Sequence, residues 1–253
     1  MMVEFIGSTG AGKTTVAAAV QRRLAVRGGT QTAPDLVASL VGLRPLARPF
    51  YRNLACDLVG LPFVLGSLGR QAAFLRFVLQ VLARQPLTLQ AANRVRSTLR
   101  KIGVYEIIQR YGGGRIVLVD EGTILHAHNL FVYTSQEWSP EDLDRFARVV
   151  PMPDVVVYVT APLALQIRRS LERSDPPREI RSRNPRLVEL YVARASALFE
   201  ALVGIPSIGE RVVRVDNSGD QRGPDGPDVE RVVASIMEKA LRAGDLDQSG
   251  PPR

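Results

Sequence analysis

The sequence predicts an α/β protein with a five-stranded parallel sheet flanked by helices, a helical insertion and an arginine-rich lid. Short apolar runs of strand length recur along the chain, and stretches with helical periodicity separate them. Alternation of strands and helices is typical of a parallel sheet. The chain has 253 residues, of which 45% are hydrophobic, so it is long enough to bury one large core.

We expect a single domain over residues 1–244, followed by a disordered tail at 245–253. The five predicted strands are 3–6, 30–32, 115–119, 154–160 and 211–216. Helices are expected at 13–26, 162–173 and 185–203, and a mostly helical insertion interrupted by prolines at 36–109. Two more helices are expected, one that starts at Ser139-Pro140 and one capped by Asp228. The lid is expected at 168–184. Ligands of such sheets bind at the carboxyl ends of the strands.

The segment "GSTGAGKT" fits the spacing Gly-x-x-x-x-Gly-Lys-Ser/Thr and follows directly on the first predicted strand. Its glycines allow a tight turn whose backbone N–H groups converge on an anion, and the next helix adds its positive dipole end. The Lys13 ammonium can reach the β- and γ-phosphates of ATP, and the Thr14 hydroxyl can bind Mg²⁺. The predicted nucleotide-binding residues here are Gly7, Ser8, Thr9, Gly10, Ala11, Gly12, Lys13, Thr14 and Thr15.

Two acids, Asp120 and Glu121, follow the third predicted strand. We expect Asp120 to complete the Mg²⁺ shell opposite Thr14, and Glu121 to bind the acceptor or accept its proton. Asp35, at the end of the second predicted strand, is a second candidate for the base, and the sequence does not choose between the two. An acidic pair after a strand also occurs in transporter-type ATPases, but their Leu-Ser-Gly-Gly-Gln signature is absent.

Arginines gather in "QIRRSLERSDPPRE", at the end of a predicted helix and the start of a loop. A mobile lid of this kind can neutralise the charge of a transferring phosphoryl group and exclude water. Arg173 and Arg178 are the predicted catalytic members, and Arg169 is assigned to nucleotide binding. A solvated basic helix end is the alternative interpretation. Further along, Asp216 and Asn217 are expected at the edge of the adenine.

This order of motifs resembles the P-loop nucleoside and nucleotide kinases, in particular thymidylate-kinase-like proteins. The resemblance covers residues 1–35 and 112–243 and includes "APLALQIRRSLERSDPPRE" and "VELYVARASALFEAL". It implies a five-stranded sheet, ATP as donor and Mg²⁺. The Asp-Arg pair and the thymine-reading pattern of thymidylate kinases are absent. This chain has Asp120-Glu121-Gly122 in place of the Asp-Arg pair. The reaction type therefore carries over better than the substrate does.

The net charge of +8 is unevenly distributed. Segment 36–104 contains the single acid Asp57 and ten basic residues, which are Arg44, Arg48, Arg52, Arg70, Arg76, Arg84, Arg94, Arg96, Arg100 and Lys101. Three interpretations stay open: a helical subdomain or homodimer face, an acceptor-binding site, and a weak contact with a membrane surface. Nucleic acid is an unlikely partner because no binding motif is present.

The only cysteine, Cys56, excludes an internal disulfide and suits the reducing cytoplasm, where we expect the protein. His126 and His128 are expected to be ordinary loop or site-wall residues, because no further cysteine or histidine supports a metal site. The predicted function is an ATP-dependent phosphotransferase acting on a hydroxyl or phosphate of a nucleoside, nucleotide or sugar-like acceptor. The alternative is a P-loop ATPase or NTP-binding regulatory protein without a small-molecule acceptor.

Overall fold

A computed structural model describes residues 1–26, 28–42, 49–84, 88–133, 137–219 and 227–242. Its centre is a five-stranded sheet of order β2-β3-β1-β4-β5 in which all pairs are parallel. The strands are β1 (Met2–Ile6), β2 (Thr30–Thr32), β3 (Ile116–Val119), β4 (Val155–Thr160) and β5 (Val212–Asp216). The predicted fold class is confirmed: the chain has a five-stranded parallel sheet flanked by helices.

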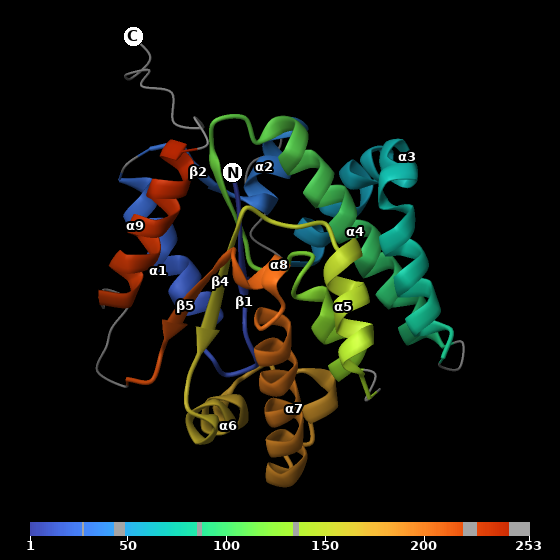
Figure 1. Cartoon of the computed structure of the whole chain (residues 1–253), viewed down its shortest axis with the longest axis vertical. Helices are drawn as coiled ribbons and strands as arrows, with labels where there is room; N and C mark the ends of the chain where they lie inside the picture. The colour runs from blue at the N-terminus through green and yellow to red at the C-terminus, as the bar shows by residue number, and fades with distance from the viewer. Residues whose placement is uncertain (27, 43–48, 85–87, 134–136, 220–226, 243–253) are drawn as a thin grey trace.

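Helices cover both faces of the sheet (Figure 1). Alternate valines of β4 point to opposite faces, as the pleat of a strand requires. Val155, Val157 and Val159 pack with α1 (Lys13–Ala25) and α9 (Pro227–Arg242) on one face. Val156 and Tyr158 pack on the other face with the remaining helices. These include α5 (Pro140–Val149), α6 (Leu163–Glu172), α7 (Pro185–Val203), α8 (Pro206–Gly209) and the short turns η1 (His128–Val132) and η2 (Arg178–Ile180).

Two helix starts follow their predicted caps, whereas Asp228, predicted to cap the last helix, lies in the first turn of α9, which begins at Pro227. Ser139 and Asp142 form a reciprocal capping box at α5, and the Asn184 side chain accepts bonds from the first turn of α7. The structure differs at Asp35, which was expected at the end of the second strand. Helix α2 (Ala33–Leu40) begins directly after β2, so Asp35 lies in its first turn, where Thr32 is the cap. The predicted tail at 245–253 lies outside the described residues.

The insertion consists of α2, α3 (Pro49–Leu82) and α4 (Leu89–Tyr111). The prediction that Pro62 interrupts the helix is wrong, because α3 continues through it. Pro62 is exposed, so water can satisfy the carbonyl that loses its helical partner. Pro45 and Pro86 lie outside the described residues.

Helix α3 is bent, as its contacts with α4 and Figure 1 both show. Gly60 faces Gly103 so closely that a Cβ on Gly103 would lie 2.8 Å from the Gly60 Cα. The Phe63 ring then meets the ring of Tyr111 further along α4, with the centroids 5.7 Å apart. Gln71, eight residues later, donates to Glu106, which is back along α4. The chain direction relative to α4 therefore reverses between Phe63 and Gln71, in a stretch that follows a proline and contains Gly66 and Gly69.

By length and composition, the part of α3 over Asn53–Leu82 passes as a helix that could cross a membrane, with 28% of its most apolar stretch buried. One long side of the helix nevertheless packs on α4 and the core, through Phe74, Phe77 and Val78. Polar contacts with α4 also tie it to the domain. Helix α3 is therefore an apolar helix that packs as part of the folded domain.

Candidate functional site

The loop between β1 and α1 has the backbone that its glycines predict. Gly7, Gly10 and Gly12 have positive φ angles of 142°, 81° and 91°. A Cβ on Gly12 would lie 2.1 Å from Nδ2 of Asn217, so a larger residue does not fit there. The same amide nitrogen donates to the Ala11 carbonyl at 2.9 Å. Asn217, predicted to line the adenine edge, therefore also holds the phosphate loop in place.

Ser8 and Thr9 are buried, unlike Thr14 and Thr15 at the start of α1. The Ser8 hydroxyl donates to Oε1 of Gln166 on α6, and Ser196 on α7 donates to the same oxygen at 3.3 Å. Gln166 in turn donates to the Ala161 carbonyl at 2.5 Å. This network ties the phosphate loop to the two helices that flank it. Gln166 was not predicted, and only its place four residues after Pro162 in the sequence hints at it.

The Lys13 side chain folds back over the loop. Its Nζ donates to the carbonyls of Gly7 at 2.7 Å and Ser8 at 3.1 Å. The pKa of Lys13 is lowered to about 8, mainly by desolvation and also by Arg173, while nearby Asp120 opposes the shift. A bound phosphate would replace these carbonyls as the partner of the ammonium group and favour its charged form.

Two cavities meet at the carboxyl end of β3. The first, here called the P-loop cavity, has a volume of about 360 Å³ and is lined by the phosphate loop and the start of the lid. The second, here called the helical cavity, has a volume of about 260 Å³ and lies between α1, α2, α3 and α4. The residues common to both are Thr14, Lys101, Asp120 and Glu121. The motif residues that the sequence predicted to converge thus lie at the junction of two cavities.

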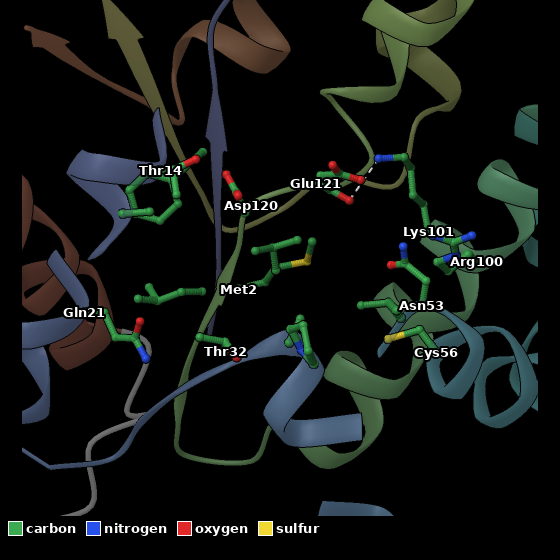
Figure 2. Close-up of a pocket in the computed structure, with 18 of the residues that line it drawn as sticks. Met2, Thr14, Gln21, Thr32, Asn53, Cys56, Arg100, Lys101, Asp120 and Glu121 are labelled. Carbon is green, nitrogen blue, oxygen red and sulfur yellow. Dashed lines mark hydrogen bonds between the residues drawn. The ribbon is translucent and has the colours of Figure 1, made fainter. Parts of the chain in front are cut away.

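Figure 2 shows Thr14 and Asp120 side by side, with Glu121 and Lys101 next along the helical cavity. A hydroxyl and a carboxylate are hard oxygen ligands, which fit Mg²⁺. Among the described residues, no cluster of three or more histidine, cysteine or acidic side chains could hold a metal by itself. Phosphate oxygens would have to complete the shell, as they do where Mg²⁺ binds with a nucleotide.

The loop that carries the acidic pair is anchored on a buried acid that sequence reasoning missed. Glu4 lies in β1 with none of its surface exposed, and its carboxylate accepts from the backbone N–H groups of Ile124 at 3.2 Å and Leu125 at 2.7 Å. Burial raises the pKa of Glu4, although these two bonds lower it in part. The signal was an acid inside an apolar strand, "VEFI", where strand residues are otherwise buried and uncharged.

Lys101 secures the same loop from α4. It is buried, and its Nζ donates to the Glu121 carbonyl at 2.9 Å, the bond drawn in Figure 2. Desolvation lowers the pKa of Lys101, and Glu121 and Glu4 both raise it. In the sequence, Lys101 was one basic residue among ten. Only the packing of α4 against the sheet distinguishes it from the others.

The predicted lid contributes unequally to the site. Arg173, Asp175, Pro176 and Pro177 line the P-loop cavity. Arg178 is exposed in η2 and lines neither of the two cavities. Arg169 donates to the Asn217 carbonyl at 3.3 Å, which places it beside the predicted adenine edge. Asp216 is exposed and accepts a bond from Ser218.

Asp35 lies apart from the reacting centre. Its carboxylate accepts from the Thr32 hydroxyl at 2.6 Å, and its backbone N–H donates to the same hydroxyl at 3.4 Å. Thr32 lines the helical cavity and Asp35 does not. Of the two candidate bases, Glu121 is the one located where the two cavities meet.

The two histidines are buried, and one of them, His128, lines a cavity. His126 is buried and shares a 2.7 Å hydrogen bond with the Thr98 hydroxyl, and His128 lines the P-loop cavity. The His128 ring stacks on Phe199 and meets the Tyr133 ring edge-on. Desolvation, together with the nearby charges of Lys13 and Lys101, lowers the pKa of His128 to about 3, so the ring is neutral.

No protein-family model and no curated protein matches the sequence. Solved structures show a limited likeness, and two of them serve as examples. Shikimate kinase from Acinetobacter baumannii in complex with shikimate is 17% identical, with a TM-score of 0.38 over 96% of this chain and 93% of that one. TT1252 from Thermus thermophilus is 19% identical, with a TM-score of 0.39 over 94% and 97%. Similarity at this level says nothing about an acceptor.

Proposed function

We propose that this protein is an ATP-dependent phosphotransferase that moves the γ-phosphoryl group of ATP to a small hydroxylated acceptor. One observation carries the proposal: the P-loop cavity and the helical cavity share Asp120 and Glu121. A hydrolytic ATPase needs room for nucleotide and water alone. A second cavity that opens on the same carboxylates supports the presence of an organic acceptor.

The roles follow from position. The phosphate loop and Lys13 bind the β- and γ-phosphates, and Arg173 approaches the same cavity from the lid. Thr14 and Asp120 would hold Mg²⁺, which when bound neutralises phosphate charge. Glu121 accepts the proton of the acceptor hydroxyl while the oxygen of that hydroxyl bonds to the γ-phosphorus. The bond from that phosphorus to the β–γ bridging oxygen breaks, and ADP leaves.

The helical cavity favours an uncharged acceptor. Arg100 donates to Asp57 at 2.6 Å and Lys101 donates to the Glu121 carbonyl, so both cations on this wall are already engaged. The neutral polar side chains on its wall include Gln21, Thr32, Asn53 and Ser97. Amides and hydroxyls offer both donors and acceptors, as a polyhydroxyl ligand needs. We therefore place sugars and nucleosides ahead of nucleotides and sugar phosphates.

The test is a phosphate-transfer screen with γ-labelled ATP over nucleosides, nucleotides, sugars and sugar phosphates. A true acceptor should take up the label and raise ADP release well above the rate with ATP alone. Rapid ADP release that no acceptor stimulates would instead favour the ATPase alternative. Label transfer only to phosphorylated compounds would overturn the preference for an uncharged acceptor while leaving the kinase proposal intact.

A further inference from the structure

The bend of α3 presents an apolar surface to solvent. From Leu54 to Gly69 each residue of this helix that is exposed is leucine, proline or glycine. Four leucines, at positions 58, 61, 65 and 68, are exposed by 65%, 48%, 60% and 44%. We call Leu58, Leu61, Pro62, Leu65, Leu68 and Gly69 the α3 corner. Figure 1 shows α3 at the outer edge of the molecule, on the far side of α4 from the sheet.

The domain itself does not require this composition. A Cβ added at Gly66 or Gly69 would meet no atom within 4 Å, whereas one at Gly60 would press on Gly103. Gly66 and Gly69 thus let the helix bend but do not serve packing inside the chain. Single exposed leucines are ordinary, but a continuous group at a protruding bend is typical of a contact surface.

Charges around the corner are positive. Between residues 53 and 101 the chain has seven basic residues and one acid, Asp57, and two of the seven, Arg100 and Lys101, line the helical cavity. Asp57 is held by Arg96 and Arg100, and only 15% of its side chain is exposed. The Arg70 and Arg96 side chains are 69% and 54% exposed, while the Glu106 that pairs with Arg70 is 9% exposed. The guanidinium groups therefore face solvent and the acids face the protein.

We infer that the α3 corner docks the protein on an anionic lipid surface. Leucines at a convex bend can enter the boundary between headgroups and acyl chains, and the surrounding arginines can approach lipid phosphates. A second copy of the chain fits less well, because its corner would bring the same positive charges face to face. In this arrangement α3 lies on the membrane surface, and its inner side stays packed on α4.

Docking would also hold the helical cavity near the membrane. Asn53 and Cys56 of α3, together with Ser97 and Arg100 of α4, line that cavity. This consequence rests on the proposed function, whereas the docking itself does not.

Flotation of the full-length protein with lipid vesicles tests the inference without nucleotide or acceptor. Vesicles of phosphatidylcholine with phosphatidylglycerol should carry the protein, and phosphatidylcholine alone should carry about tenfold less. Leu65→Glu should reduce binding at least tenfold, and added salt should weaken it. Leu241→Glu is the matched control, because Leu241 is 63% exposed on α9, and it should bind as the wild type does.

Circular dichroism confirms that each variant is folded, and Arg76→Glu provides a charge variant at an exposed position whose binding should fall. Failure of the wild-type protein to bind anionic vesicles would overturn the inference. An equal loss of vesicle binding in Leu65→Glu and Leu241→Glu would also overturn it. A concentration-dependent dimer that Leu65→Glu dissociates, without vesicle binding, would assign the corner to a second copy instead. None of these outcomes bears on ATP binding, which is measured separately.

Discussion

The carboxylate of Glu4 accepts a hydrogen bond from the backbone N–H of Leu125 at 2.7 Å, although 121 residues separate the two. The bond joins the first strand of the sheet to the loop that follows Asp120 and Glu121. A second bond, from the N–H of Ile124 at 3.2 Å, reaches the same carboxylate. The loop of the acidic pair is therefore held by an acid that lines neither of the two described cavities.

Glu4→Ala should destabilise the protein by about 2–4 kcal/mol, because it leaves two buried N–H groups without an acceptor. Urea denaturation gives the free energy of unfolding. Glu4→Gln keeps the shape and one acceptor oxygen, so it should cost less than the alanine variant. If both variants have the same free energy of unfolding as the wild type, the loop is not held by this carboxylate.

Glu121→Gln should lower kcat by roughly 10²–10⁴-fold if the carboxylate accepts the acceptor's proton. ATP binding should hardly change, because Glu121 does not hold the phosphates in this mechanism.

Asp120→Asn should instead raise the Mg²⁺ concentration needed for half-maximal rate, since it removes a charge from the metal shell. Steady-state kinetics with the identified acceptor measure both effects. A glutamine variant with wild-type kcat would remove Glu121 from the chemistry.

Arg173→Ala should lower kcat by roughly 10²-fold, because Arg173 lines the P-loop cavity and would meet the charge of the transition state. Arg178→Ala should change kcat little, since Arg178 lines neither described cavity. Parallel kcat and KM measurements on the two variants decide the matter. An equal loss at both positions would indicate that the lid closes over the nucleotide and brings Arg178 in with it.

ATP binding should take up protons above pH 8. Lys13 has a pKa of about 8 in the free protein, and phosphate should raise it, so affinity should fall as pH rises through that value. Titration calorimetry at pH 8.5 in two buffers of different ionisation enthalpy reports the proton uptake. Lys13→Met should bind ATP weakly and without this uptake. Proton release by the wild-type protein would contradict the assignment.

Acid should destabilise the protein through its buried histidines. Burial lowers the pKa values of His128, to about 3, and of His126. Their contribution to stability is complete above the unfolded value of about 6.5. It is lost as pH falls from there towards the folded values, by up to about 1.4 kcal/mol per pH unit for each histidine. Urea denaturation of wild type and His128→Phe at pH 7, 6 and 5 should show a smaller decline for the variant.

Local chemistry explains what the sequence by itself determined. The five strands, the phosphate loop and the capped starts of α5 and α7 depend on residues that lie close together in the chain. Apolar runs, glycine spacing and a Ser-Pro start are read within a few residues, and tertiary context did not override them. The nearness of Thr14 to Asp120 was also predictable, because parallel strands put their carboxyl ends at one edge.

Only the tertiary structure decided which side chains act together across long separations. It buried Glu4 and Lys101 behind the acidic loop and moved Asp35 into a helical first turn. It also let α3 continue through Pro62, and it separated Arg173 from Arg178. Each of these outcomes depends on packing between segments far apart in the chain. Hydrophobic burial has no direction of its own, so the identity of a neighbour is settled by the shape of the whole core.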